Sequence, residues 1–362
     1  TGNLGTATTT VADSVTMTAA YNVLNGKTVN HDGSESAQAL VVTIASADAA
    51  ADLSNITSDI TNLTANFSET QTFIGNLDSK TASVANDITV TATAADVTGD
   101  TIAAAGNGNI AVTALHSTLA ADLSGLSSST GAVTAAFDGT GTFTGNLGTA
   151  TTTVADSVTM TTTAAKATGK TINEAELENA TVVITALDQT LAADLSGITT
   201  NAVTAAFDGT GTFTGNLGTA TTTVADSVTM TAAYNVLNGK TVNHDGSESA
   251  QALVVTIASA DAAADLSNIT SDITNLTANF SETQTFIGNL DSKTASVAND
   301  ITVTATAADV TGDTIAAAGN GNIAVTALHS TLAADLSGLS SSTGAVTAAF
   351  DGTGTFTGNL GT

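Results

Sequence analysis

The chain has 362 residues, of which 33 are acidic and only six are Lys or Arg, so its formal net charge at neutral pH is −27. A surface of this charge repels nucleic-acid phosphates and anionic lipid headgroups, which excludes nucleic acid and membrane surfaces as partners. Cys, Pro and Trp are absent and aromatic residues make up 3%. The core must therefore consist of Val, Ile, Leu, Ala and a few Phe, without disulfides or Cys-ligated metals. The chain also lacks a run of eighteen apolar residues, so no membrane span is expected.

Internal repetition dominates the sequence. Residues 1–149 recur unchanged as 214–362, and the Phe that precedes each Gly-Asn-Leu triplet marks modules of 70–73 residues. The modules are 1–73, 74–143, 144–213, 214–286 and 287–356. Both ends carry the hexapeptide Thr-Gly-Asn-Leu-Gly-Thr, so we expect the sequence to be a segment cut from a longer array.

A shorter period lies inside each module. In the module 144–213, a turn and an apolar anchor at 145–147 lead to a predicted strand at 158–161. The same pattern leads from 169–172 to a strand at 182–185, and from 194–198 to a strand at 203–207. Alternating Val, Ile and Thr predict strands, and the Gly, Asn, Asp and Ser between them predict turns. Each repeating unit is thus about 24 residues long, with three units per module.

A 24-residue unit with two or three short strands cannot bury its own apolar face, but stacked copies form a continuous core. We therefore predict an all-β repeat β-solenoid, a right-handed parallel β-helix that runs as one continuous segment from 1 to 362. The alternative is a tandem array of Ig-like β-sandwiches, although 71 residues is short for that fold. The residues predicted to point inward are Phe143, Leu147, Val158, Ile172, Ile184, Leu195 and Phe207.

Three motifs set in this Thr- and Ala-rich acidic sequence carry a resemblance to a known family. They are Val-Thr-Met-Thr at 158–161, Gly-Lys-Thr-Ile at 169–172 and Asp-Leu-Ser-Gly-Ile at 194–198. The chain resembles the very large β-strand repeat surface proteins and adhesins of Gram-negative bacteria and cyanobacteria. This resemblance implies secretion by a one-step exporter that reads a C-terminal signal. Calcium-binding members carry Gly-Gly-x-Gly-x-Asp nonapeptides, which this sequence lacks.

Candidate catalytic residues are few. The His residues are His31, His116, His244 and His329, and each stands alone in its module, which favours a surface-loop position. Ser residues are abundant, but the Gly-x-Ser-x-Gly motif of a nucleophile elbow is missing. A Ser-His-Asp set would have to be assembled from distant positions. The sequence therefore predicts that the protein is not an enzyme, with no catalytic, cofactor-binding or metal-binding residues.

The Asp-Gly-Thr-Gly turns at Asp138, Asp208 and Asp351 resemble part of a calcium loop. One Asp per turn is too few for an ion that takes six to eight oxygen ligands. We expect solvated turns, no required cofactor, and at most weakly bound Ca²⁺.

The sequence also contains Thr runs and one variable loop. Thr140-Gly141-Thr142 and Thr151–Thr153 make ice binding a minor alternative, since Thr ladders on a flat face order water. The loop changes between modules: His31–Ser36, Ala103–Asn109 and Glu174–Glu178 follow equivalent positions. Such a loop edge is a candidate binding surface, because repeat proteins often present variable loops on one face.

Perfect duplication favours a role in which length matters. We expect a structural rod, stalk or filament at the bacterial cell surface or in a biofilm matrix, outside the cell. Its partners would be further copies or a continuation of the same repeat, joined head to tail or laterally. The alternative is an adhesive module that binds carbohydrate, a cation or a surface or matrix partner at the loop edge, although Tyr21 and Tyr234 are the only Tyr or Trp residues for sugar stacking.

Overall fold

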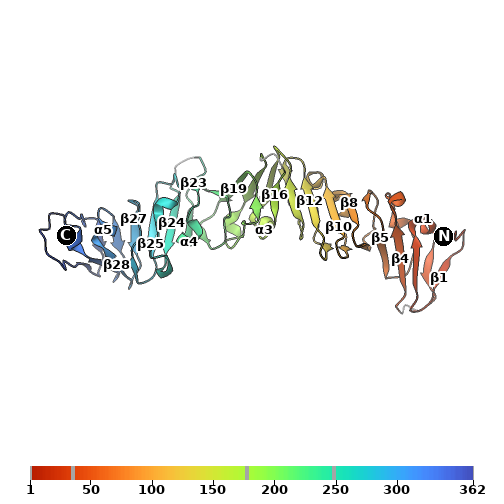
Figure 1. The fold of residues 1–362 in the computed structure, drawn as a ribbon, viewed down its shortest axis with the longest axis horizontal. Coiled ribbons are helices and arrows are strands. Elements are labelled where there is room, and N and C mark those ends of the chain that lie inside the picture. Colours follow the sequence, from red (N-terminus) through yellow and green to blue (C-terminus); the bar gives the residue numbers. More distant parts are fainter. Residues whose placement is uncertain (1, 34–36, 176–178, 247–249, 362) are drawn as a thin grey trace. The chain divides into compact units, whose positions relative to one another are not determined.

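The computed structural model describes residues 2–33, 37–175, 179–246 and 250–361 (Figure 1). It is mostly β, with 41% of residues in strands and 12% in helices. The chain divides into two compact units. Unit 1 comprises residues 1–183 and 197–202, and unit 2 comprises 184–196 and 203–362.

The strands of unit 1 form parallel sheets in which neighbours are alternate strands along the chain. The longest sheet has the order β18-β16-β14-β12-β10-β8-β6, a second has β11-β9-β7-β5-β4-β2, and smaller groups are β1-β3 and β13-β15-β17. Figure 1 shows β8, β10, β12 and β16 side by side. The bounds are β1 Thr9–Val11, β2 Thr16–Ala20, β3 Val29–His31, β4 Ala39–Ile44, β5 Leu63–Phe67, β6 Gln71–Phe73, β7 Thr81–Val84, β8 Thr89–Thr93, β9 Ile102–Ala104, β10 Asn109–Thr113, β11 Leu126–Ser128, β12 Val133–Phe137, β13 Gly141–Thr142, β14 Thr151–Val154, β15 Thr159–Thr163, β16 Ile172–Glu174, β17 Thr181–Thr185 and β18 Ile198–Thr199.

Unit 2 repeats this arrangement. Its sheets have the orders β20-β22-β24-β25-β27-β29-β31, β26-β28-β30-β32 and β19-β21-β23. The bounds are β19 Ala202–Phe207, β20 Gly211–Phe213, β21 Thr221–Val224, β22 Thr229–Ala233, β23 Val242–His244, β24 Ala252–Ile257, β25 Leu276–Phe280, β26 Gln284–Phe286, β27 Thr294–Val297, β28 Thr302–Thr306, β29 Ile315–Ala317, β30 Asn322–Thr326, β31 Leu339–Ser341 and β32 Val346–Ala348.

The register places equivalent residues of successive repeats beside each other. Ile102 pairs with Leu126 in a parallel ladder, and Val90 pairs with Ile110. Along each strand the side chains alternate between buried and partly exposed, as in β4 and β25. This period of two sends one set of side chains to the interior and the other to the surface. The mostly β, parallel, stacked architecture predicted from the sequence is confirmed at this level.

Short helical turns interrupt the strands, and the sequence analysis had predicted no helix. The α-helical turns are α1 Tyr21–Leu24, α2 Ala94–Val97, α3 Ala164–Ala167, α4 Tyr234–Leu237 and α5 Ala307–Val310. The 3₁₀ turns are η1 Ser46–Asp48, η2 Leu53–Asn55, η3 Leu115–Ser117, η4 Leu187–Gln189, η5 Ser259–Asp261, η6 Leu266–Asn268 and η7 Leu328–Ser330. One turn is too short to show a 3.6-residue period. In α2 a capping box between Thr93 and Asp96 supplies the local signal that was missed.

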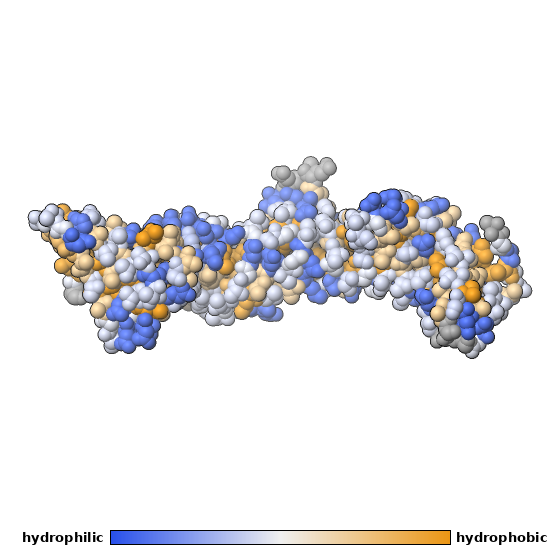
Figure 2. All heavy atoms as spheres, turned by 60° about the horizontal axis from the view of Figure 1, so that its bottom comes forward, coloured by the Kyte–Doolittle hydropathy of each residue, from blue (hydrophilic) through white to orange (hydrophobic). Residues whose placement is uncertain are grey.

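The core is narrow and aliphatic, with Phe as its largest members. All seven residues predicted to point inward are buried, from Ile172 and Ile184 at 0% exposure to Val158 at 9%. In addition, Phe67 packs edge-on against Phe73, with ring centroids 5.1 Å apart. At the surface, polar and apolar residues are mixed along the visible face (Figure 2).

Identical sequences in different surroundings allow a matched test of the core. Phe137 is 0% exposed, whereas Phe350 in the same ten-residue sequence is 41% exposed. We expect Phe137→Ala to lower the free energy of unfolding by about 3 kcal/mol or more, because it leaves a cavity. Phe350→Ala should cost less than half of that. Urea titration at low protein concentration measures both, and equal losses would show that the inward face is wrongly assigned.

Candidate functional site

The Asp-Leu-Ser motif forms a corner between strands. The Asp122 carboxylate accepts a hydrogen bond from the backbone N–H of Ser124, at 3.0 Å, and Asp194 does the same with Ser196. These bonds hold the pKa of both carboxyls below its usual value. The backbone of Asp122 also bridges to Asn146 in the following repeat. The motif therefore fixes a turn and its register, and its acceptor oxygens are engaged locally.

Each His is paired with an Asp from the next repeat, which corrects the expectation that the His residues stand alone. His116 Nδ1 lies 2.5 Å from Asp138 Oδ1, and His31 Nε2 lies 3.5 Å from Asp59 Oδ2. The copies in unit 2 are His244 with Asp272 and His329 with Asp351. Asp138 follows His116 by 22 residues and Asp59 follows His31 by 28. A search for ionic partners one repeat length away would have found them.

The His116 ring also lies near a hydroxyl. Ser117 Oγ is 3.4 Å from His116 Nε2, so Ser117, His116 and Asp138 form a chain in the order seen in Ser-His-Asp sets. The side chains of His116 and Asp138 are 38% and 43% exposed. An activated nucleophile needs a shorter contact and preorganised donors in a water-excluded site. This arrangement serves better as a polar contact between repeats.

The third module carries a different residue at the His116 position. Asp188 follows Leu187 as His116 follows Leu115, so a carboxylate replaces the imidazole. In unit 2 the pKa of Asp208, the equivalent of Asp138, is raised by desolvation and by the negative charges of Asp188 and Asp245. Asp188 Oδ1 is buried without a hydrogen-bond partner. This module therefore loses an attractive pair and gains a repulsive one.

The Asp-Gly-Thr-Gly turns have packing roles. A Cβ on Gly139 would lie 2.5 Å from the ring of His116, so Gly allows the His116–Asp138 contact. Thr140 Oγ1 accepts a hydrogen bond from the Thr159 N–H at 3.1 Å. Among the described residues, no group of three or more His, Cys, Asp or Glu side chains is arranged to hold a metal ion.

One position alternates between Lys and a buried Asp. Lys27 and Lys170 each donate from Nζ to a Gly carbonyl of the preceding repeat, at 2.6 Å. Asp100 and Asp313 occupy this position in the second and fifth modules and are only 8% and 9% exposed. Desolvation raises the pKa of both carboxyls to about 6.

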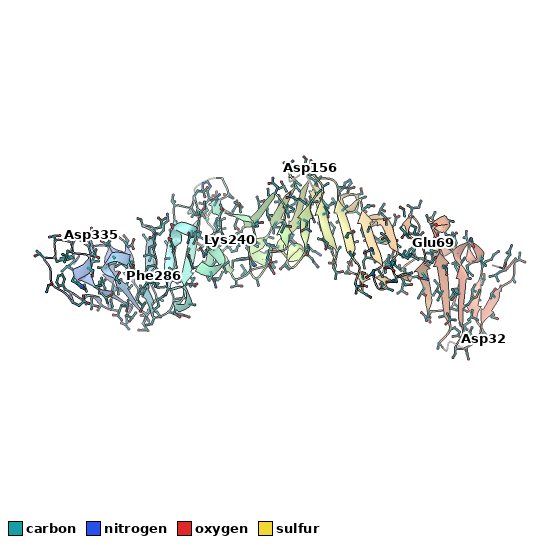
Figure 3. All side chains as sticks on the ribbon, viewed as in Figure 1. Asp32, Glu69, Asp156, Lys240, Phe286 and Asp335 are labelled. Carbon is teal, nitrogen blue, oxygen red and sulfur yellow. The ribbon has the colours of Figure 1, made fainter. Side chains whose placement is uncertain are left out.

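The variable-loop edge is partly described. Ser34–Ser36 and Glu176–Glu178 lie outside the described residues. A hollow of about 170 Å³ beside the first loop is lined by His31, Ala37, Gln38, Ile60, Thr61 and Asn62. Sites for small organic ligands usually exceed about 300 Å³. In Figure 3, Asp32, Glu69 and Asp156 lie beyond the ends of strands.

The Thr runs do not continue from strand to strand. Thr152 is fully buried, and partly exposed Thr153 has Ala136 and Asn173 as its cross-strand neighbours. A flat Thr face would need Thr at those neighbouring positions too. The Thr content is better explained by the preference of β-branched residues for strands.

Comparisons with protein-family models, curated proteins and solved structures gave no match. Within the described part of the chain, no helix is long and apolar enough to cross a bilayer. Function must therefore be argued from the geometry of the repeats.

The two buried Asp residues predict an unusual pH dependence. A carboxyl with a raised pKa binds its proton more tightly in the folded chain, so folding should become more stable as pH falls from 7 to 4. Each site should contribute about 1–3 kcal/mol, lost as pH rises from 3.8 through about 6. Asp100→Asn with Asp313→Asn should flatten this dependence. Denaturant titration across pH 4–7 measures it, and Asp138→Asn with Asp351→Asn is the control. An unchanged slope in the first variant would contradict the prediction.

Proposed function

We propose that the chain is a right-handed β-solenoid and that it acts as a structural repeat protein. In this proposal it forms a rod, stalk or filament at a bacterial cell surface or in a biofilm matrix. The observation that carries the proposal is the parallel register, in which each strand pairs with a strand about one repeat length away. Ile102 with Leu126, and Asp122 with Asn146, are separated by the 24 residues that the sequence period predicts.

The chemistry of the surface supports a structural role. The polar groups that drew attention as candidate sites are engaged in joining one repeat to the next: Asp122 at a corner, His116 with Asp138, and Lys170 with a Gly carbonyl. Groups that bind a substrate are usually poised toward a cleft instead. The charge of −27 also keeps neighbouring copies apart in solution.

The alternative is a binding module at the variable-loop edge. It is supported by the change of loop sequence between modules while the strand register is kept, as His31 pairs with Val11 and Glu174 with Val154. A carbohydrate, a cation or a matrix partner would fit this alternative.

Small-angle scattering and negative-stain imaging test the proposed shape. We expect a thin cylinder without joints, because a solenoid has no boundary between modules. Far-UV circular dichroism should show mainly strand with a minor helical contribution from the short turns. Five jointed beads would favour the sandwich alternative, and a compact particle with tight binding of one defined ligand would favour the binding module.

Removal of calcium tests the expected independence from cofactors. We expect the fold to persist in chelator, because the turn at Asp138 is stabilised by protein groups such as His116. Divalent cations should raise the unfolding midpoint slightly by screening negative charge. Thermal unfolding with EDTA, and with added Ca²⁺ or Mg²⁺, measures both effects. Complete unfolding in EDTA would show that the Asp-Gly turns hold structural calcium.

A further inference from the structure

Two open edges of the structure have matching sequences. Residues 203–213 and 346–356 are identical, as are 220–231 and 7–18. In unit 2 the first pair of segments is joined: β19 and β20 lie against β21 and β22 in parallel register. The other copies, 346–356 and 7–18, lack this partner within the described chain.

The exposure of identical residues shows what is missing at the C-terminal edge. Phe350 is 41% exposed and Leu360 is 57% exposed, while Phe207 and Leu217 at the equivalent positions are both at 0%. The strand itself is also shorter, since β32 has three residues and β19 has six. The edge therefore carries unpaired backbone groups next to apolar side chains.

The N-terminal edge is open in the complementary way. Val15 is 47% exposed, whereas Val228 at the equivalent position is 7% exposed. A hollow of about 750 Å³ lies at this edge and is lined by residues that include Met17, Thr18 and Ala19. In unit 2 the equivalents of these three residues pair with Gly211, Thr212 and Phe213.

We propose that the C-terminal edge of one copy, residues 346–361, binds the N-terminal strands, residues 7–18, of a second copy. The register is that of unit 2, so Ala349 lies opposite Thr10 and Phe350 opposite Val11. This inference rests on the proposed structural function and names its partner. Because the two surfaces are different patches of the chain, the contact is heterologous and each added copy leaves a new open edge.

The backbone bonds of the contact follow from unit 2. Ala225 N–H donates to Phe207 C=O at 3.1 Å, so Ala12 N–H would donate to Phe350 C=O. Thr229 N–H donates to Thr210 Oγ1 at 3.1 Å, so Thr16 N–H would donate to Thr353 Oγ1. The apolar side chains at both edges are removed from water in the same step.

The contact requires one local exchange. Residues 1–6 and 357–362 have the same sequence as 214–219, and only one copy of this hexapeptide fits between the two sets of strands. Lys27 Nζ donates to Gly5 C=O, and the equivalent Lys240 Nζ donates to Gly218 C=O. Gly361 of the first copy therefore replaces Gly5 of the second as the acceptor for Lys27.

Cysteine cross-linking tests the register, because the native chain has no Cys. One protein carries Ala349→Cys and the other Thr10→Cys, both at exposed positions on the outward side of the strands. After mixing and oxidation with copper phenanthroline, we expect a disulfide-linked heterodimer. The matched control replaces Ala349→Cys with Ala206→Cys, which has the same neighbours in sequence but already pairs with Thr223 in its own chain. Equal cross-linking in the two mixtures, or none in either, would overturn the proposal.

A second measurement follows association without engineered cysteines. Val15→Lys places a charge that would be buried only in the contact, whereas Ile74→Lys changes an apolar residue that is 60% exposed away from both edges. Analytical ultracentrifugation should show loss of the larger species in Val15→Lys and their retention in Ile74→Lys. A wild-type protein that stays monomeric at all concentrations would reject the contact. If that monomer is still a thin cylinder, the structural function stands without it, whereas a cross-linked but compact particle would reject the structural function alone.

Discussion

The parallel ladder between successive repeats is the constraint on which the rest of the structure depends. It places each residue directly beside its equivalent in the next repeat, as with Ile102 and Leu126. A side chain is therefore packed mainly by a side chain of similar shape in the same rotameric environment. This favours Val, Ile, Thr and Ala over large aromatic residues, since a narrow interior of fixed strand spacing cannot accommodate a larger ring at every level.

The ladder also explains why the polar residues occur in pairs one repeat apart. A charged group at one level is 4–5 Å from the equivalent level above and below it, so like charges in register repel. His116 with Asp138 places opposite charges in that relation when the imidazole is protonated. Asp188 with Asp208 places like charges there, and the pKa of Asp208 rises in response. The surface of −27 is thus tolerable because most acids lie on turns, where solvent screens them.

The sequence predicted the parts of the fold that depend on period. Strand positions, the inward Phe and Ile residues and the repeat length all follow from recurrence at fixed spacing, which is visible without any contact information. The helical turns such as α2 were missed because four residues carry no periodicity and Ala, Thr and Asp are weak signals. The His116–Asp138 contact was missed for a different reason. It joins loops of different repeats, and loop lengths vary, so the separations of 22 and 28 residues depart from the average period.

Burial in this protein is a property of the neighbouring repeat more than of the sequence itself. Phe207 and Phe350 have the same flanking residues, yet one is fully buried and the other is 41% exposed. Neither local propensity nor composition distinguishes them, and the difference lies in whether a strand equivalent to β21 covers them. A repeat that is stable only when covered is stabilised cooperatively by its neighbours. The same dependence makes an uncovered end an adhesive surface, because the free energy released inside the array by covering Phe207 is available at Phe350 to any segment with the sequence and register of β21.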